Sequence, residues 1–161
     1  MTLMKPHLLT EEGLEKLTDE LENLLGEGRE RVADRLHRAF QDGQDDDFVE
    51  NAELEAARNE QAFMEGRIQE LEDILKNYQL IGNSGGSPDS VGVGDWVTVS
   101  EEGVDDEERY HLVGAAEADP TAGRISNESP LGEALLGKKV GEVVRVNAPN
   151  GILEFRVVKI G

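Results

Sequence analysis

The chain has 161 residues, contains no cysteine and carries a formal net charge of −19 at pH 7. Without cysteine there is no disulfide and no thiolate metal site, and this much negative charge argues against generic nucleic-acid binding through a basic surface. The sequence contains no run of about 18 apolar residues that could cross a membrane. Its N-terminus lacks the basic flank and apolar core of a signal peptide. We therefore expect a cytoplasmic protein without membrane contact, built as one ordinary domain or two small ones.

Residues 1–80 have the apolar periodicity of two long helical arms. On each arm most apolar residues recur at alternating steps of three and four, which is the heptad seam of a coiled coil. Gly26 and Gly28 interrupt the first arm, and we expect a kink or short break there because each glycine costs a helix interior roughly 1 kcal/mol. The seam residues are Leu14, Leu17, Leu21, Leu24, Val32, Leu36, Ala39 and Phe40 on the first arm, and Met64, Ile68, Leu71, Leu75 and Tyr78 on the second.

The second arm is rich in alanine next to the loop that joins the arms, with Ala52, Ala56 and Ala57 on its seam. Small side chains let two helices approach closely, so we predict an antiparallel α-helical coiled-coil hairpin with a thin tip. A dimerising coiled coil is the alternative. Because a two-arm hairpin covers its own seam, we expect a monomer.

A different pattern follows the hairpin. Residues 81–90 are rich in glycine, serine and proline, which is typical of a flexible linker. In residues 91–161, apolar and polar residues alternate in four segments, which predicts β-strands at 96–99, 110–113, 143–146 and 152–158. One short helix is expected between them, with Ser129 as its N-cap, Pro130 at its first position and Gly137 just past its end. The predicted class is α+β: a helical hairpin followed by a small antiparallel sheet domain with one short helix.

The loop between the arms holds a cluster of carboxylates: Asp42, Asp45, Asp46, Asp47 and Glu50. Carboxylate oxygens suit hard cations such as Mg²⁺, which is often bound through one or two protein carboxylates while keeping several waters. A loop tip alone offers no enclosing cage, so such a site needs a second set of ligands from another molecule. Helix capping is the simpler explanation for Asp47 and Glu50, which have the spacing of an N-cap and its third helical residue. Capping does not explain Asp45 and Asp46.

The rest of the chain shows no self-contained active site. His7, His37 and His111 lack metal-ligand spacing, and no nucleophile motif or phosphate-binding glycine loop occurs. Arg58 and Arg67 on the second arm suit either contact with nucleic acid or ion pairs along the helix surface.

At this point the sequence resembles the bacterial Gre family of transcript cleavage factors, GreA/GreB-like. The resemblance is carried by Glu50-Asn51-Ala52-Glu53, Ala56-Ala57-Arg58, Glu65-Gly66-Arg67-Ile68, Val113-Gly114, Glu117-Ala118-Asp119, Ile125-Ser126, Ser129-Pro130-Leu131 and Ala134-Leu135-Leu136-Gly137-Lys138. It spans nearly the whole chain.

The resemblance implies an FKBP-like C-terminal domain and docking on core RNA polymerase, with the hairpin inserted through the secondary channel. Asp47-Phe48-Val49-Glu50 fills the family's tip pattern, so Asp47 and Glu50 are the implied ligands of a Mg²⁺ ion shared with the polymerase. Arg58 matches a basic position that faces the nascent RNA of the elongation complex, and Glu128, Ser129 and Pro130 fall in the implied polymerase-docking region. The implied function is accessory: the polymerase's own active centre hydrolyses backtracked RNA, and the factor stimulates it.

Some residues depart from the family pattern. The tip is longer than usual and the insertion carries extra aspartates, while Phe40 and Leu54 stand where a basic residue and a tyrosine are usual. An aspartate-rich tip also resembles the inhibitory Gre homologues, which occlude the channel and suppress catalysis without cleavage. A third hypothesis is an acidic coiled-coil adaptor or FKBP-like chaperone unrelated to transcription.

Overall fold

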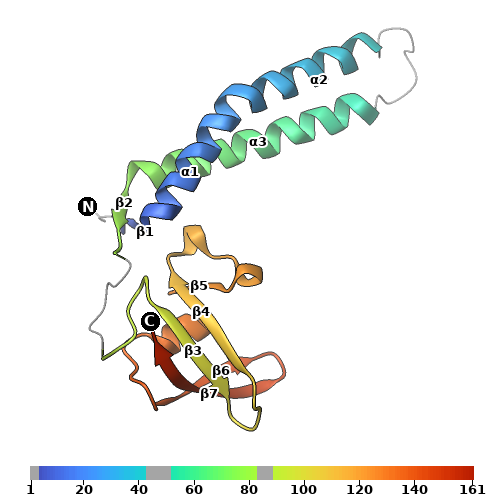
Figure 1. The fold of residues 1–161 in the computed structure, drawn as a ribbon. Helices are drawn as coiled ribbons and strands as arrows, with labels where there is room; N and C mark the ends of the chain where they lie inside the picture. The colour runs from blue at the N-terminus through green and yellow to red at the C-terminus, as the bar shows by residue number, and fades with distance from the viewer. Residues whose placement is uncertain (1–3, 43–51, 83–88) are drawn as a thin grey trace. The chain divides into compact units, whose positions relative to one another are not determined.

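The computed structural model describes residues 4–42, 52–82 and 89–161 (Figure 1). Their contacts divide the chain into two compact units, a hairpin unit of Glu15–Lys76 and a globular unit of Met1–Leu14 with Asn77–Gly161. The predicted α+β organisation is confirmed, because a long helical hairpin precedes a sheet domain. In the described ranges, no helix has the length and apolar character needed to cross a membrane.

The hairpin unit is built from three α-helices: α1 (Glu11–Asn23, whose first turn is grouped with the globular unit), α2 (Arg29–Asp42) and α3 (Ala52–Lys76). Figure 1 shows α2 and α3 side by side. Val32 of α2 packs with Met64 and Ile68 of α3 in a small buried cluster, and the half-buried Leu21, Leu24 and Leu36 complete it. These are seam residues of the predicted pattern, so the heptad spacing identified the face along which the arms meet.

The expected interruption of the first arm takes the form of a π-helical segment, η1 (Leu24–Gly28). A π-turn holds one more residue than an α-turn. The seam needs this residue, because the apolar spacing from Leu24 to Val32 is one residue longer than a heptad. Gly28 is buried within the segment, where an added Cβ would lie 3.3 Å from the sulfur of Met64.

Three seam predictions are wrong. Phe40 is 57% exposed, because its neighbour Ala39 occupies the seam and adjacent helical residues cannot share one face. On the second arm Ala52 is exposed and takes no part in the seam, whereas Leu75 is half-buried like Leu21 and lies beside the buried Ile74. Tyr78 is exposed and lies in strand β2 (Tyr78–Leu80), because α3 ends at Lys76.

The globular unit is organised around a five-stranded sheet in the order β5-β4-β3-β7-β6. Its strands are β3 (Trp96–Glu101), β4 (Glu107–Val113), β5 (Arg124–Ser126), β6 (Val143–Ala148) and β7 (Gly151–Ile160). The four predicted strands are confirmed. β5 was missed, and because it pairs with β4 in parallel the sheet is not wholly antiparallel as predicted. A strand of three residues is too short to show alternation.

The predicted short helix is confirmed as α4 (Pro130–Leu135). The Ser129 hydroxyl caps it by accepting a hydrogen bond from the Gly132 amide at 3.1 Å, and Gly137 follows the helix with a φ of +76°. Leu135 is buried in the core of the sheet, together with Val97, Val99, Leu112, Val144, Phe155 and Val157. Gly132 has no room for a side chain, since a Cβ there would collide with the Ser126 carbonyl oxygen.

Both ends of the hairpin sequence contribute to the globular unit. Strand β1 (His7–Leu9) pairs with β2 in parallel, and neither strand was predicted. The Glu117 carboxylate accepts hydrogen bonds from the Thr10 amide at 2.8 Å and from the Thr10 hydroxyl at 2.6 Å. Glu117 lies in a short 3₁₀ turn, η2 (Ala115–Glu117), and a second one, η3 (Pro120–Ala122), leads into β5. The start of α1 is thus bound to the loop after β4.

We predict that the Ile68→Ala variant unfolds its hairpin at lower urea concentration than the wild type. Ile68 is 3% exposed in the seam cluster, and truncation of a buried isoleucine to alanine costs about 2–5 kcal/mol. Phe63→Ala is the control on the same helix. Because Phe63 is 83% exposed, its loss should change the stability by no more than about 0.5 kcal/mol. Circular dichroism at 222 nm measures both, and equal effects would contradict the assigned seam.

Candidate functional site

The carboxylates of the predicted site lie almost wholly outside the described residues. Asp45, Asp46, Asp47 and Glu50 fall in the range 43–51, and Asp42 is described only as the last residue of α2. What the structure does describe is the pair of helix ends that carry this loop. Their packing and charges therefore form the basis of the site.

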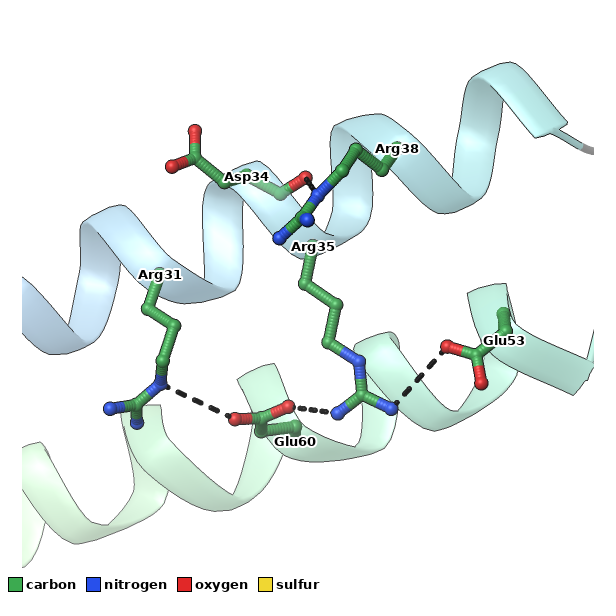
Figure 2. A network of polar contacts seen from close by, with 6 residues as sticks. All are labelled: Arg31, Asp34, Arg35, Arg38, Glu53 and Glu60. Atoms are coloured by element: carbon green, nitrogen blue, oxygen red, sulfur yellow. Dashed lines mark hydrogen bonds and ion pairs between the residues drawn. The ribbon is translucent and has the colours of Figure 1, made fainter.

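An ion-pair network joins the two arms beside the loop (Figure 2). Arg35 of α2 pairs with both Glu60 and Glu53 of α3, the second at 3.5 Å, and Arg31 approaches Glu60 at 3.9 Å. Arg38 differs: its guanidinium bonds to the backbone oxygen of Asp34 in its own helix at 3.4 Å. Later residues of α2 pair with earlier residues of α3, as the predicted antiparallel arrangement requires.

The arms also approach closely here. Ala39 of α2 and Ala57 of α3 are buried at 4% and 0% exposure, so at this end of the hairpin methyl groups take the place of larger apolar side chains. The predicted role of the alanine-rich seam is confirmed for Ala57. Less apolar area is buried by alanine than by leucine or isoleucine, so the ion pairs contribute a larger share of the stability close to the loop.

Three further ion pairs, made by two arginines, lie farther from the loop. Arg29 binds the Glu65 carboxylate through two nitrogens, each at 3.0 Å. This bond lowers the pKa of Glu65 below its ordinary value. Arg67 binds Glu20 at 2.7 and 2.9 Å and Glu70 at 2.9 Å, and the Glu20 contact raises the pKa of the guanidinium. Of the two interpretations of Arg67, the ion-pair one is confirmed.

Arg58 differs from Arg67 in its surroundings. Its side chain is exposed on α3, one residue beyond the buried Ala57, and it makes no ion pair within 4.0 Å with a carboxylate of residues 4–42, 52–82 or 89–161. Arg31 and Arg35 are held by glutamates, so the cationic surface near the loop is smaller than the number of arginines suggests. The sequence pattern did not single out this pairing. The ion pairs across the arms could have been predicted from oppositely charged residues that lie at similar distances from the loop on the two arms.

Glu128, Ser129 and Pro130 lie at the N-terminal end of α4. Glu128 and Pro130 are exposed, whereas Ser129 is half-buried and its hydroxyl donates to the Ser126 carbonyl oxygen at 2.6 Å. Ser129 thus has a structural role as a helix cap. Beside it is an open hollow of about 590 Å³, lined by Glu128 with Lys5, His7, Gly114, Asn127, Glu133 and Leu136 among others.

In the part of the chain that the structure describes, no group of three His, Cys, Asp or Glu residues is placed to hold a metal ion. His37 is exposed on α2, and its Nε2 lies 3.3 Å from the side-chain nitrogen of Gln41 in the same helix.

Comparison with known proteins matches both parts of the chain to one family. A family model described as "Transcription elongation factor, N-terminal" matches residues 7–80, and one described as "Transcription elongation factor, GreA/GreB, C-term" matches residues 86–161. The chain is 44% identical over 160 residues to the transcription elongation factor GreA of Acetivibrio thermocellus, covering 99% of each chain. It is 47% identical over 158 residues to GreA of Thermoanaerobacter pseudethanolicus, covering 98% of this chain and 99% of that one. Among solved structures, the GreA factor homolog 1 of Thermus thermophilus is 34% identical, with 98% of this chain and 99% of that one covered and a TM-score of 0.42.

We predict that Arg35→Ala loosens the end of the hairpin next to the loop. Loss of Arg35 leaves Glu53 and Glu60 without their shared cation, and exposed pairs of this kind contribute about 0.2–1 kcal/mol each. Hydrogen–deuterium exchange of the amides of residues 53–60 should become faster, while amides near Ile68 keep their protection. Arg38→Ala is the matched control, because Arg38 makes no ion pair or hydrogen bond across the hairpin within the described ranges. Equal acceleration by both variants would contradict the network.

We predict that Glu65 titrates below the ordinary glutamate range and returns to it in Arg29→Gln. A carboxyl whose pKa is lowered by folding adds stability above its unfolded pKa, and that stability is lost as the pH falls through the folded pKa. The arms should therefore weaken below about pH 4.3, the unperturbed value. A pH titration followed by NMR measures the shift; an unchanged Glu65 pKa in the variant would refute the assignment.

Proposed function

Because the chain belongs to the GreA/GreB family of transcription elongation factors, we propose that it binds core RNA polymerase as a monomer and stimulates hydrolysis of backtracked nascent RNA. The observation that carries the proposal is the match of the full chain to this family, together with Asp47-Phe48-Val49-Glu50 at the end of a helical hairpin. The chain acts as an accessory factor, since the reacting groups belong to the polymerase.

The hairpin supplies reach. The 25 residues of α3 make a helix about 38 Å long at 1.5 Å per residue, and the loop at 43–51 follows directly from α2. Inserted through the secondary channel, such an arm delivers the loop to the polymerase active centre. The ion pairs of Arg35 and Arg31 hold α2 and α3 of the hairpin together although the apolar core between them is narrow.

Asp47 and Glu50 are the proposed ligands of a Mg²⁺ ion that is shared with polymerase carboxylates. Carboxylate oxygens match the preference of this hard cation. When bound, Mg²⁺ supplies activation of water and stabilisation of charge on the phosphodiester. In this proposal the chain brings two carboxylates to the polymerase active centre, and they leave again when the hairpin is withdrawn.

Two other surfaces complete the proposal. Arg58, exposed on α3, faces the nascent RNA as a point of positive charge. Glu128 and Pro130, with the α4 cap at Ser129 holding their backbone, dock on the polymerase outside the channel.

A stalled, backtracked elongation complex with end-labelled RNA tests the function. With the wild-type chain and Mg²⁺, we expect a shortened RNA that resumes elongation. Asp47→Ala or Glu50→Ala should reduce the cleavage rate about tenfold or more, the scale of perturbed metal sites, while polymerase binding survives and added Mg²⁺ restores part of the rate. Asp34→Ala removes an exposed carboxylate of the same hairpin and should have no effect.

The extra aspartates, Asp45 and Asp46, favour a second candidate, a channel-occluding inhibitor. Wild-type protein that shortens no RNA but slows nucleotide addition would sink the cleavage proposal and establish this one. Loss of cleavage in Asp34→Ala to the same degree as in Asp47→Ala would also overturn the assigned ligands.

A further inference from the structure

The face of the globular sheet that points away from the core carries a cationic and aromatic surface. Residues that are paired across a sheet lie on the same face. Trp96 of β3 is paired with His111 of β4, and His111 with Arg124 of β5, which forms one row across the sheet. In the next row, Thr98 of β3 is paired with Arg109 of β4 and Lys159 of β7. We call these six residues the outer face, because the alternate residues Val97, Val99, Leu112 and Val157 are buried in the core.

A bulge in the sheet puts Lys159 in this surface. The pairing of β3 with β7 shifts by one residue between Thr98 and Val99, so that Thr98 is paired with Lys159 and Val99 with Val157. Without the shift, one of the two β7 residues would point to the wrong face, because the side-chain period of a strand is two. The bulge therefore keeps Val157 in the core and adds a cation to the outer face.

No cation of the outer face is held in an ion pair in the described ranges; Arg124 has one acidic neighbour, Asp119, whose pKa its charge helps to lower. The chain has 16 Lys and Arg against 35 Asp and Glu, and Arg29, Arg31, Arg35, Arg67, Arg145 and Arg156 all make ion pairs. In contrast, Arg109, Arg124 and Lys159 make no ion pair within 4.0 Å with a carboxylate of those ranges. In a chain with such an excess of acids, three cations outside ion pairs on two adjacent rows form a local positive surface that attracts an anionic ligand.

An aromatic stack stands among these cations. The Trp96 and His111 rings are parallel to within 9° with their centroids 4.5 Å apart, and the Arg109 guanidinium carbon lies 4.3 Å from the Trp96 centroid. A contact of 3.1 Å between His111 Nε2 and the Gly94 carbonyl oxygen holds the imidazole in place. Stacked rings flanked by arginine form the kind of platform on which nucleobases stack in proteins that bind single strands.

A hollow of about 500 Å³ opens beside the stack, lined by Trp96, His111 and Arg124 with Glu12, Gly94 and Ala122. Its size and its flat aromatic wall suit a planar heterocycle. The Glu12 carboxylate disfavours a phosphate inside the hollow, so phosphates fit better along the row of Arg109 and Lys159. An acidic peptide could bind the cations, but its carboxylates would gain nothing from the aromatic stack or the hollow.

We propose that the outer face binds single-stranded nucleic acid, with one base in the hollow against the Trp96–His111 stack and the backbone phosphates along Arg124, Arg109 and Lys159. The binding is weak and strongly dependent on salt, because the net charge of −19 opposes it beyond this surface. It requires no polymerase, so its test is independent of transcript cleavage.

Fluorescence of Trp96 gives a direct test, since it is the chain's single tryptophan. The full chain is titrated with an RNA octamer at low salt. We expect the emission to be quenched, and the logarithm of the binding constant to fall against the logarithm of salt concentration with a slope of about −2, or about −0.7 for each of three phosphates. Anisotropy of a labelled octamer provides a second readout that does not depend on the tryptophan.

Arg109→Gln, Arg124→Gln and Lys159→Gln should each weaken binding and make the slope less steep by about 0.7, and His111→Gln should weaken binding about fivefold or more through lost stacking. Lys139→Gln, an exposed cation in the loop between α4 and β6, is the matched control and should change nothing. The proposal is overturned if the octamer causes no quenching, if Lys139→Gln weakens binding as much as the outer-face variants, or if polyglutamate binds equally well and displaces the RNA. Circular dichroism verifies that each variant is folded.

Discussion

The hairpin depends on one constraint: two helices in contact can bury only a single stripe each, so the whole arm is held by a narrow seam. Val32, Met64 and Ile68 supply large apolar side chains in the middle of this seam. Toward the loop the seam narrows to Ala39 and Ala57, and arginine–glutamate pairs on its edge add to the weak apolar contact. The arm is consequently thin at the end next to the loop, and its stability falls in the same direction. Segments with few buried contacts open most readily, so the ends of α2 and α3 next to the loop should open before the middle of the hairpin does.

Charge in this chain is organised by region rather than spread evenly. Most arginines of the hairpin are neutralised by glutamates of the facing or the same helix, as with Arg67 between Glu20 and Glu70. Arg38, Arg58 and the cations of the outer face are among the exceptions in the described ranges. So negative a net charge opposes indiscriminate contact with nucleic acid, while positive charge is retained at a few places on the surface.

The elements with strong periodicity could be predicted from the sequence, and the short or cooperative ones could not. Leu17, Val32, Met64, Ile68 and Leu71 were found from heptad spacing, and the cap at Ser129 from its hydroxyl and the following proline. Strands β1, β2 and β5 have three residues each and form only because a distant segment pairs with them. Tyr78 fits the helical pattern of the sequence, but in the structure it lies in β2 and is paired with His7 of β1. At the candidate site the residue types of the loop were informative, while the ion pairs across the arms required knowledge of the register between two helices.

The π-helical segment at Leu24–Gly28 has a consequence for how the length of the hairpin can change. A π-turn absorbs one extra residue without turning the following helix out of phase, so a chain lacking one residue there would form a continuous α-helix with Val32 still on the seam. In α3 there is no such segment, and each inserted residue would rotate everything beyond it by about 100°. Between Leu14 and Asp42 and between Ala52 and Lys76, insertions and deletions should therefore be confined to the two glycines of the first arm. The second arm has to keep its number of residues.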